Sequence, residues 1–174
     1  MAPPRPAIRH PSGVRTGLLL VGLAGVAALV AATFTTVIRI TVGTTTRLAS
    51  LDTELSGWDR HGPALLVIAG FALVMLLGAY GRGARPAMAA VAACGAAALV
   101  VVLVFDLPHL NDTGQVGRLY DDAAAGAQVG FWLELAGGAL LVAAGLGMLV
   151  LARGRARNER ASRAPVVAGA ADRT

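Results

Sequence analysis

Four long apolar stretches run along the chain, and polar segments separate them. The last stretch, residues 130–151, contains a single acid, and five arginines follow it closely. An α-helix rises about 1.5 Å per residue, so this stretch covers roughly 33 Å, enough to cross a bilayer core. The pattern predicts an all-α polytopic membrane protein with four transmembrane helices in a bundle. We expect the spans at about residues 17–38, 64–80, 88–105 and 130–151.

The segments outside these spans are polar. Residues 1–16 contain four prolines, which remove backbone donors and block helices, so we expect a disordered cytoplasmic tail there. Residues 17–152 then form the transmembrane domain, with exported loops at 39–63 and 106–129. Residues 153–174 form a basic cytoplasmic tail, for which we also expect disorder.

The first span leaves two questions open. A positive segment before an apolar run also describes a signal peptide, with a small-residue cleavage site at 30–32. The apolar run continues beyond that site through Phe34 and Ile38, which favours an uncleaved helix. The β-branched segment 35–46 predicts either a short exported strand or an extension of the helix.

Arginines and acids are distributed unequally between the segments expected on the two sides of the membrane. The tails and the middle turn hold eleven of the 15 arginines, whereas the two loops and their margins hold eight of the ten acids. Because arginine favours the cytoplasmic side, we expect both termini in the cytoplasm and both loops outside. This bias explains most of the net charge of +5, so we expect no nucleic-acid partner. The basic residues are all arginine and the chain has 22 glycines, which is typical of a GC-rich bacterial genome and indicates a bacterial plasma membrane.

Small residues recur at four-residue spacing in the third and fourth spans. Such faces let helix backbones approach closely in lipid, so we expect these two helices to pack tightly against each other. The same spacing is also compatible with a homodimer. The single cysteine, Cys94, lies in an alanine-rich run and is expected to be buried. The faces consist of Ala89, Ala93 and Ala97, of Ala92 and Ala96, and of Ala139, Ala143 and Gly147.

Glu134 is the acid inside the fourth span, about one turn from its outer end. An ionised carboxylate at membrane depth costs a few kcal/mol unless it is paired, protonated or in reach of water. One interpretation is a proton- or cation-coupled binding residue. The other is an interfacial acid that pairs with Arg39, which lies at a matched depth at the end of the first span. We therefore name Glu134 and Arg39 as the candidate binding pair.

Other chemistry has little support in the sequence. His61 and His109 lie in the two exported loops near several aspartates, but no zinc-type spacing appears, so we expect solvated histidines and no metal site. No histidine lies inside a span, which argues against haem. Nucleophile, phosphate-binding and dinucleotide motifs are also absent from the sequence, so we expect neither an enzyme nor a cofactor.

The segment LAGGALLVAAGLGMLVLARGRAR (135–157) is similar to the last helix and basic tail of the tryptophan-operon-associated membrane proteins. The arrangement as a whole resembles four-helix integral membrane proteins that are common in actinobacteria. The first loop holds one tryptophan, Trp58, where the tryptophan-operon-associated proteins have a tryptophan-rich loop. No function or site residue is therefore transferred from this resemblance.

The leading functional hypothesis is a non-enzymatic membrane protein that acts as an accessory or assembly partner of a larger membrane or envelope complex. Its expected partners are the lipid bilayer and either another membrane protein or further copies of the same chain. The alternative is a small transporter or permease subunit that uses Glu134.

Overall fold

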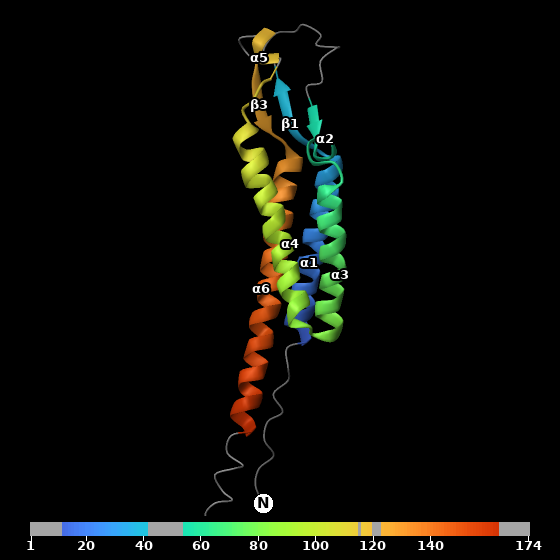
Figure 1. The fold of residues 1–174 in the computed structure, drawn as a ribbon, viewed down its shortest axis with the longest axis vertical. Helices are drawn as coiled ribbons and strands as arrows, with labels where there is room; N and C mark the ends of the chain where they lie inside the picture. Colours follow the sequence, from blue (N-terminus) through green and yellow to red (C-terminus); the bar gives the residue numbers. More distant parts are fainter. Residues whose placement is uncertain (1–11, 42–53, 115, 120–122, 164–174) are drawn as a thin grey trace, which may run out of the picture.

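The computed structural model describes residues 12–41, 54–114, 116–119 and 123–163. Within these residues, four helical segments are long and apolar enough to cross a membrane. They lie side by side in one elongated bundle (Figure 1). The mostly helical architecture with four candidate spans is therefore confirmed. The segments are Gly13–Phe34, Ala64–Arg82, Arg85–His109 and Val129–Arg160.

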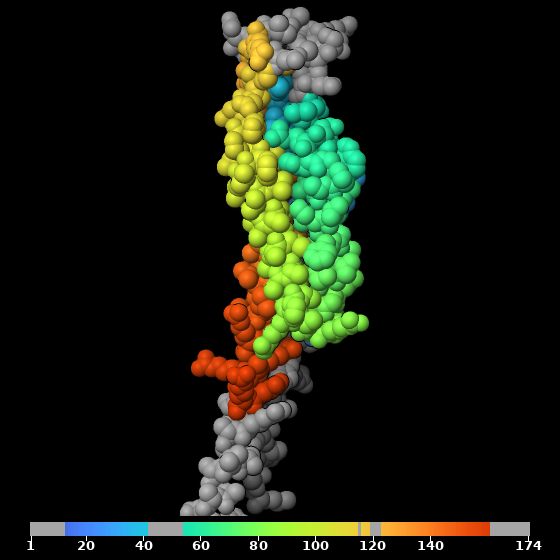
Figure 2. All heavy atoms as spheres, viewed as in Figure 1, coloured from blue at the N-terminus to red at the C-terminus, as the bar shows by residue number. Residues whose placement is uncertain are grey.

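The two ends of the bundle differ. One end, called the sheet end below, carries the three strands and two short helices, α2 (Gly57–His61) and α5 (Val116–Leu119). At the other end, called the tail end, α1 (Ser12–Phe34) begins and α6 (Val129–Arg163) finishes. Helix α6 projects at the tail end beyond the other helices (Figure 2). The helix ends that meet there carry Arg15, Arg82 and Arg85, and the last turns of α6 carry further arginines.

Parts of the two segments expected to be disordered, 1–16 and 153–174, are helical. Helix α1 begins at Ser12, directly after Pro11, because a helix can form once the prolines have ended. Helix α6 runs through residues 152–163, where arginine, alanine and glutamate favour a helix and arginine complements its C-terminal dipole. The rest of both predicted tails, residues 1–11 and 164–174, lies outside the described residues.

A small antiparallel sheet settles whether residues 35–41 extend the first helix. Helix α1 ends at Phe34, and β1 (Thr36–Thr41) follows as the central strand of the order β2-β1-β3. Strand β2 (Glu54–Ser56) pairs with β1 on one side and β3 (Ala124–Ala127) on the other. The first span is thus shorter at its outer end than the expected limit at Ile38, because the β-branched residues there pair as a strand. The remainder of that segment, 42–46, lies outside the described residues.

The turn between α3 (Ala64–Arg82) and α4 (Arg85–Val100) is short. Gly83 has a φ of 66°, a left-handed conformation that glycine adopts without steric cost, and its N–H donates to the carbonyl of Ala79. Pro86 then lies in the first turn of α4, where the missing N–H costs no helical hydrogen bond. These two residues allow α3 and α4 to form a tight antiparallel hairpin.

Glycines bring α6 against its neighbours in the middle of the bundle. A Cβ atom added at Gly95 of α4 would lie 2.6 Å from the carbonyl oxygen of Gly138 in α6, and one at Gly145 would lie 2.5 Å from the amide of Ala92. The same construction at Gly25 of α1 gives 3.0 Å to the carbonyl of Gly137. The expected tight packing of the third and fourth spans is confirmed.

The expected contact faces, in contrast, are mostly wrong. Ala89, Ala93 and Ala97 point outward, as do Ala139 and Ala143. Alanine and glycine recur on several faces of these helices, so four-residue spacing alone does not select one. The contacts use glycine, the residue that allows backbone atoms to touch.

The core of the bundle is apolar, and so is much of its outside. Buried residues from α1, α3, α4 and α6 form a continuous apolar cluster that includes Cys94, as expected for this cysteine. Large apolar side chains such as Phe71, Val74 and Val150 are more than half exposed. A surface of this kind suits lipid contact and supports a membrane-embedded helical protein.

Candidate functional site

Glu134 lies one turn inside α6, and the start of that helix is fixed against β1. A Cβ atom at Gly130 would lie 2.8 Å from the carbonyl oxygen of Thr36, so the backbones of α6 and β1 are in direct contact. Phe131 is buried beside Val37 and Ile38. This packing turns Glu134 into the bundle, where its exposure is 0%.

Neither carboxylate oxygen of Glu134 has a hydrogen-bond partner in the described part of the chain. A buried polar group without a partner costs free energy, and an ionised one costs considerably more. Unpaired buried carboxylates are therefore rare and call for a physical explanation. This one lies in a cluster with two other chemically active side chains.

The second acid, Asp106, comes from an irregular part of the third span. After α4 the chain continues as a π-helix, η1 (Val101–Asp106), and a 3-10 turn, η2 (Leu107–His109). Two α-helical turns beyond the buried Ala98 would end at about residue 105. The wider π-helical turn instead keeps Asp106 on the inner face at 0% exposure and leaves Phe105 outside. Such π segments occur frequently at functional sites.

Arg60 and His61 reach the cluster from the short helix α2. Ser56 caps this helix, because its hydroxyl accepts from the Asp59 N–H while the Asp59 carboxylate accepts from the Ser56 N–H and hydroxyl. These hydrogen bonds, that from the Ser56 side chain first, lower the pKa of Asp59. At Gly57 an added Cβ would lie 2.6 Å from the carbonyl oxygen of Ala32, so α2 rests directly on the end of α1.

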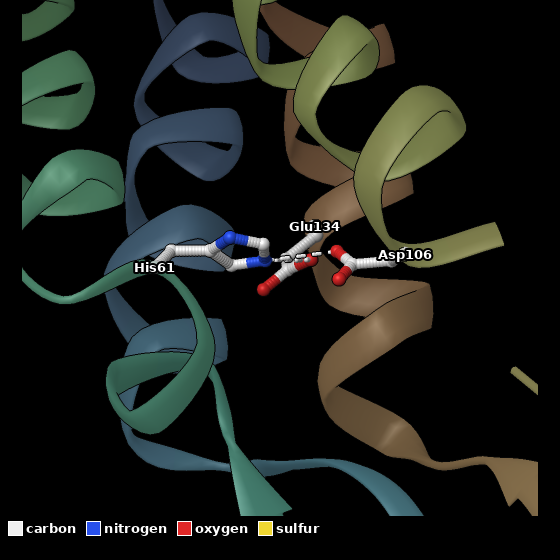
Figure 3. Close-up of side chains that lie close together, drawn as sticks. All are labelled: His61, Asp106 and Glu134. Atoms are coloured by element: carbon white, nitrogen blue, oxygen red, sulfur yellow. Dashed lines mark hydrogen bonds and ion pairs between the residues drawn. The ribbon is translucent and has the colours of Figure 1, made fainter. Parts of the chain in front are cut away.

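The three elements bring His61, Asp106 and Glu134 together (Figure 3). His61 Nε2 lies 2.9 Å from Asp106 Oδ2 and 3.9 Å from Glu134 Oε2. On its other oxygen, Asp106 accepts from Arg60 Nε at 2.7 Å. Arg60 Nη2 also donates to the carbonyl of Phe105 at 3.1 Å, where the regular α-helix has ended. One ligand atom from each of the three residues lies within 4.8 Å of the others.

The charges of this cluster do not balance. With both carboxylates ionised and the imidazole neutral, two negative charges face the single positive charge of Arg60. A net buried charge is unfavourable in a low-dielectric environment, so one more positive charge is needed at Glu134. A proton or a bound cation would supply it.

The structure does not contain the expected Arg39–Glu134 pair. Arg39 lies on β1 and pairs instead with Glu54 of the adjacent strand, at 2.8 Å between Nη2 and Oε1. Both side chains are about half exposed, because the chain leaves α1 as a strand and carries Arg39 away from the bundle interior. The expectation of matched depth therefore fails at the end of the first span.

Sequence reasoning selected Glu134 but missed its neighbours. His61 was expected to be solvated, yet its side chain is only 9% exposed, whereas the His109 ring lies outside the cluster and contacts the carbonyl of Phe105. A usable signal was present, because Asp106 and Glu134 both lie at the outer margins of the two spans expected to pack together. Nothing in the sequence indicated that α2 folds back over the bundle.

The tail end holds a second polar feature. A pocket of about 260 Å³ is lined by three arginines, one acid and two methionines, among other residues. Arg15 donates to the carbonyls of Ala79 and Tyr80 and lies over the Tyr80 ring, so it is already engaged in closing the end of α3. The polar lining residues are Arg15, Arg85, Arg155 and Glu159, and the methionines are Met88 and Met148.

No protein-family model matches this chain, and no curated protein matches it significantly.

Proposed function

We propose that this chain is a non-enzymatic integral protein of a bacterial plasma membrane, with both termini in the cytoplasm. The arginines of the tail end support this orientation, since cytoplasmic loops and tails carry most arginines. Trp58 stacks on Phe34 at the sheet end with its ring about half exposed, and Trp132 is exposed at the same end. Tyr80 lies at the tail end. Aromatic residues at both ends suit the two membrane interfaces.

Within that class, we propose the role of an accessory or assembly partner of a larger membrane or envelope complex. The observation that supports it is the distribution of polar groups inside the bundle. Among the described residues, the buried polar side chains are Thr33, Asp106 and Glu134, all toward the sheet end. From there to the tail end the core is apolar and is closed by glycine contacts. Such an interior suits a protein that binds a partner better than one that conducts a solute.

A gentle extraction into nanodiscs tests this role. The tagged chain is purified with its native lipids, and bound proteins are identified by mass spectrometry and counted by native mass. We expect a defined partner at fixed stoichiometry. A monomer or a homodimer without another protein contradicts the proposal.

The alternative function is a small transporter or permease subunit, and the unpaired Glu134 favours it. A carboxylate that must gain and lose a cation is the usual basis of coupled transport in a membrane bundle. In this case, proteoliposomes should show pH-dependent solute uptake that disappears in Glu134→Gln. Arg39→Ala is the matched control, because it removes a charge at the sheet end of the bundle without touching the cluster. Uptake that is equal in both variants, or absent in the parent protein, contradicts transport.

A further inference from the structure

The cluster at the sheet end has the composition of a metal site. One imidazole nitrogen and two carboxylate oxygens converge there from three separate elements, α2, η1 and α6. The fully buried Glu134 carboxylate faces the other two donors, accepts no hydrogen bond, and lies 3.9 Å from His61 Nε2 (Figure 3). We propose that His61, Asp106 and Glu134 bind one divalent transition-metal ion, with Zn²⁺ as the best match. This inference does not depend on either proposed function.

Two of the three distances between the ligand atoms are close to those around a small tetrahedral ion, and all three are within 4.8 Å. Bonds of about 2.0–2.1 Å to zinc in tetrahedral geometry place neighbouring ligand atoms roughly 3.3 Å apart. The separation between His61 Nε2 and Asp106 Oδ2 is 2.9 Å, and that between His61 Nε2 and Glu134 Oε2 is 3.9 Å. One gap has to open and the other to close by about half an ångström each, which small side-chain rotations supply. The metal then occupies the place of the hydrogen bond between His61 and Asp106.

The donor types select the class of metal. Imidazole nitrogen combined with carboxylate oxygen suits Zn²⁺ and its neighbours in the first transition series, whereas Mg²⁺ and Ca²⁺ prefer oxygen ligands. Three protein ligands leave the fourth position of a tetrahedral ion open to water. Sulfur is not involved, because the single cysteine, Cys94, lies in the core of the bundle.

The charges also fit. A divalent cation supplies two positive charges, which neutralise the two carboxylates and leave the charge of Arg60 over. Arg60 keeps its hydrogen bond to the second oxygen of Asp106 and so orients this ligand from outside. Its own charge reaches solvent, since its side chain is 18% exposed. The edge formed by Arg60 and His61 is therefore the entry route for the ion.

Metal titration of the full-length protein in nanodiscs tests the proposal. The protein is stripped with a chelator, and Zn²⁺ is added in competition with a chromophoric chelator. We expect one equivalent bound with micromolar affinity or tighter, and a rise in the unfolding temperature, because an ion that binds only the folded state stabilises it. Co²⁺ in place of Zn²⁺ should give visible absorption bands of a tetrahedral nitrogen–oxygen site.

Variants locate the ion. Glu134→Gln keeps the shape of the side chain and His61→Ala removes the nitrogen donor, and each should weaken Zn²⁺ binding by about tenfold or more. His109→Ala is the matched control, a histidine at the same end that lies outside the cluster, and should leave the affinity unchanged. Two separate variants keep the test decisive if one folds poorly. An absence of binding in the parent protein, unchanged affinity in either site variant, or an equal loss in His109→Ala overturns the proposal.

Discussion

In the middle of the bundle the third span and α6 touch through their backbones, whereas at the sheet end the same span and helix face each other through Asp106 and Glu134. The first contact depends on the absence of side chains, and it leaves no room for water or ions. The second depends on charged side chains with an imidazole and a guanidinium beside them. One pair of helices therefore combines a region sensitive to added volume with a region sensitive to charge.

The largest effect is expected from removing the guanidinium. Arg60→Ala leaves Asp106 buried without its main counter-charge, and breaking a buried pair in this way costs about 3 kcal/mol of folding free energy. Arg39→Ala removes the same kind of side chain from the exposed pair with Glu54 and should cost less than about 1 kcal/mol. Unfolding in mixed detergent micelles measures both. Equal losses would show that charge burial does not distinguish the sheet end.

The second-largest loss of stability is expected from a methyl group added in the middle of the bundle. Gly95→Ala places a Cβ atom against backbone atoms of Gly138 and Val142 that cannot rotate away, and should cost about 2 kcal/mol. Gly70→Ala in α3 meets nothing within 4 Å and should be neutral or gain up to about 1 kcal/mol from helix propensity. The same unfolding measurement compares them. If both variants behave alike, the close contact of α4 and α6 is wrong.

Replacing each acid of the cluster by its amide should have opposite effects on folding stability. In metal-free protein, Glu134→Gln replaces a buried carboxylate that accepts no hydrogen bond by a neutral amide of the same shape, and loss of the buried charge should raise stability by roughly 1 kcal/mol. Asp106→Asn weakens two hydrogen bonds to its partners and should lower stability. The unfolding temperatures of the two variants provide the readout. A change of the same sign in both would contradict the charge imbalance described above.

The smallest effect concerns the cap of α2. Ser56→Ala removes the hydroxyl that caps this helix and should cost roughly 1 kcal/mol. The cap also carries a pH dependence. The pKa of Asp59 is lowered in the folded state. The ionised carboxylate therefore contributes to folding stability near neutral pH, and this contribution is lost as the pH falls below about 4. Unfolding measured between pH 3 and about 7 should show this acid sensitivity in the parent protein and less of it in the variant.

The sequence predicted the spans because each of them has to be apolar over a length fixed by the bilayer. It also indicated Glu134, since an acid within such a stretch stands out. The partners of Glu134 were not predictable in the same way. His61 and Asp106 reach it only because α2 folds back onto α1 and because a π-helical turn rotates Asp106 inward, and neither event leaves a periodic pattern. The contact glycines were hidden by the many small residues around them.

The contrast between α6 and the third span has a mechanical consequence. Helix α6 is one uninterrupted element of 35 residues, about 52 Å long, with Glu134 near one end and exposed arginines near the other. The third span changes from an α-helix to a π-helix and then to a 3-10 turn within its last ten residues, and we expect it to bend there. A continuous helix therefore lies beside a span whose helical geometry is interrupted near one end. We expect any movement at the cluster to bend the third span locally and to displace α6 as a whole, which would carry an event at the sheet end to the tail end of the bundle.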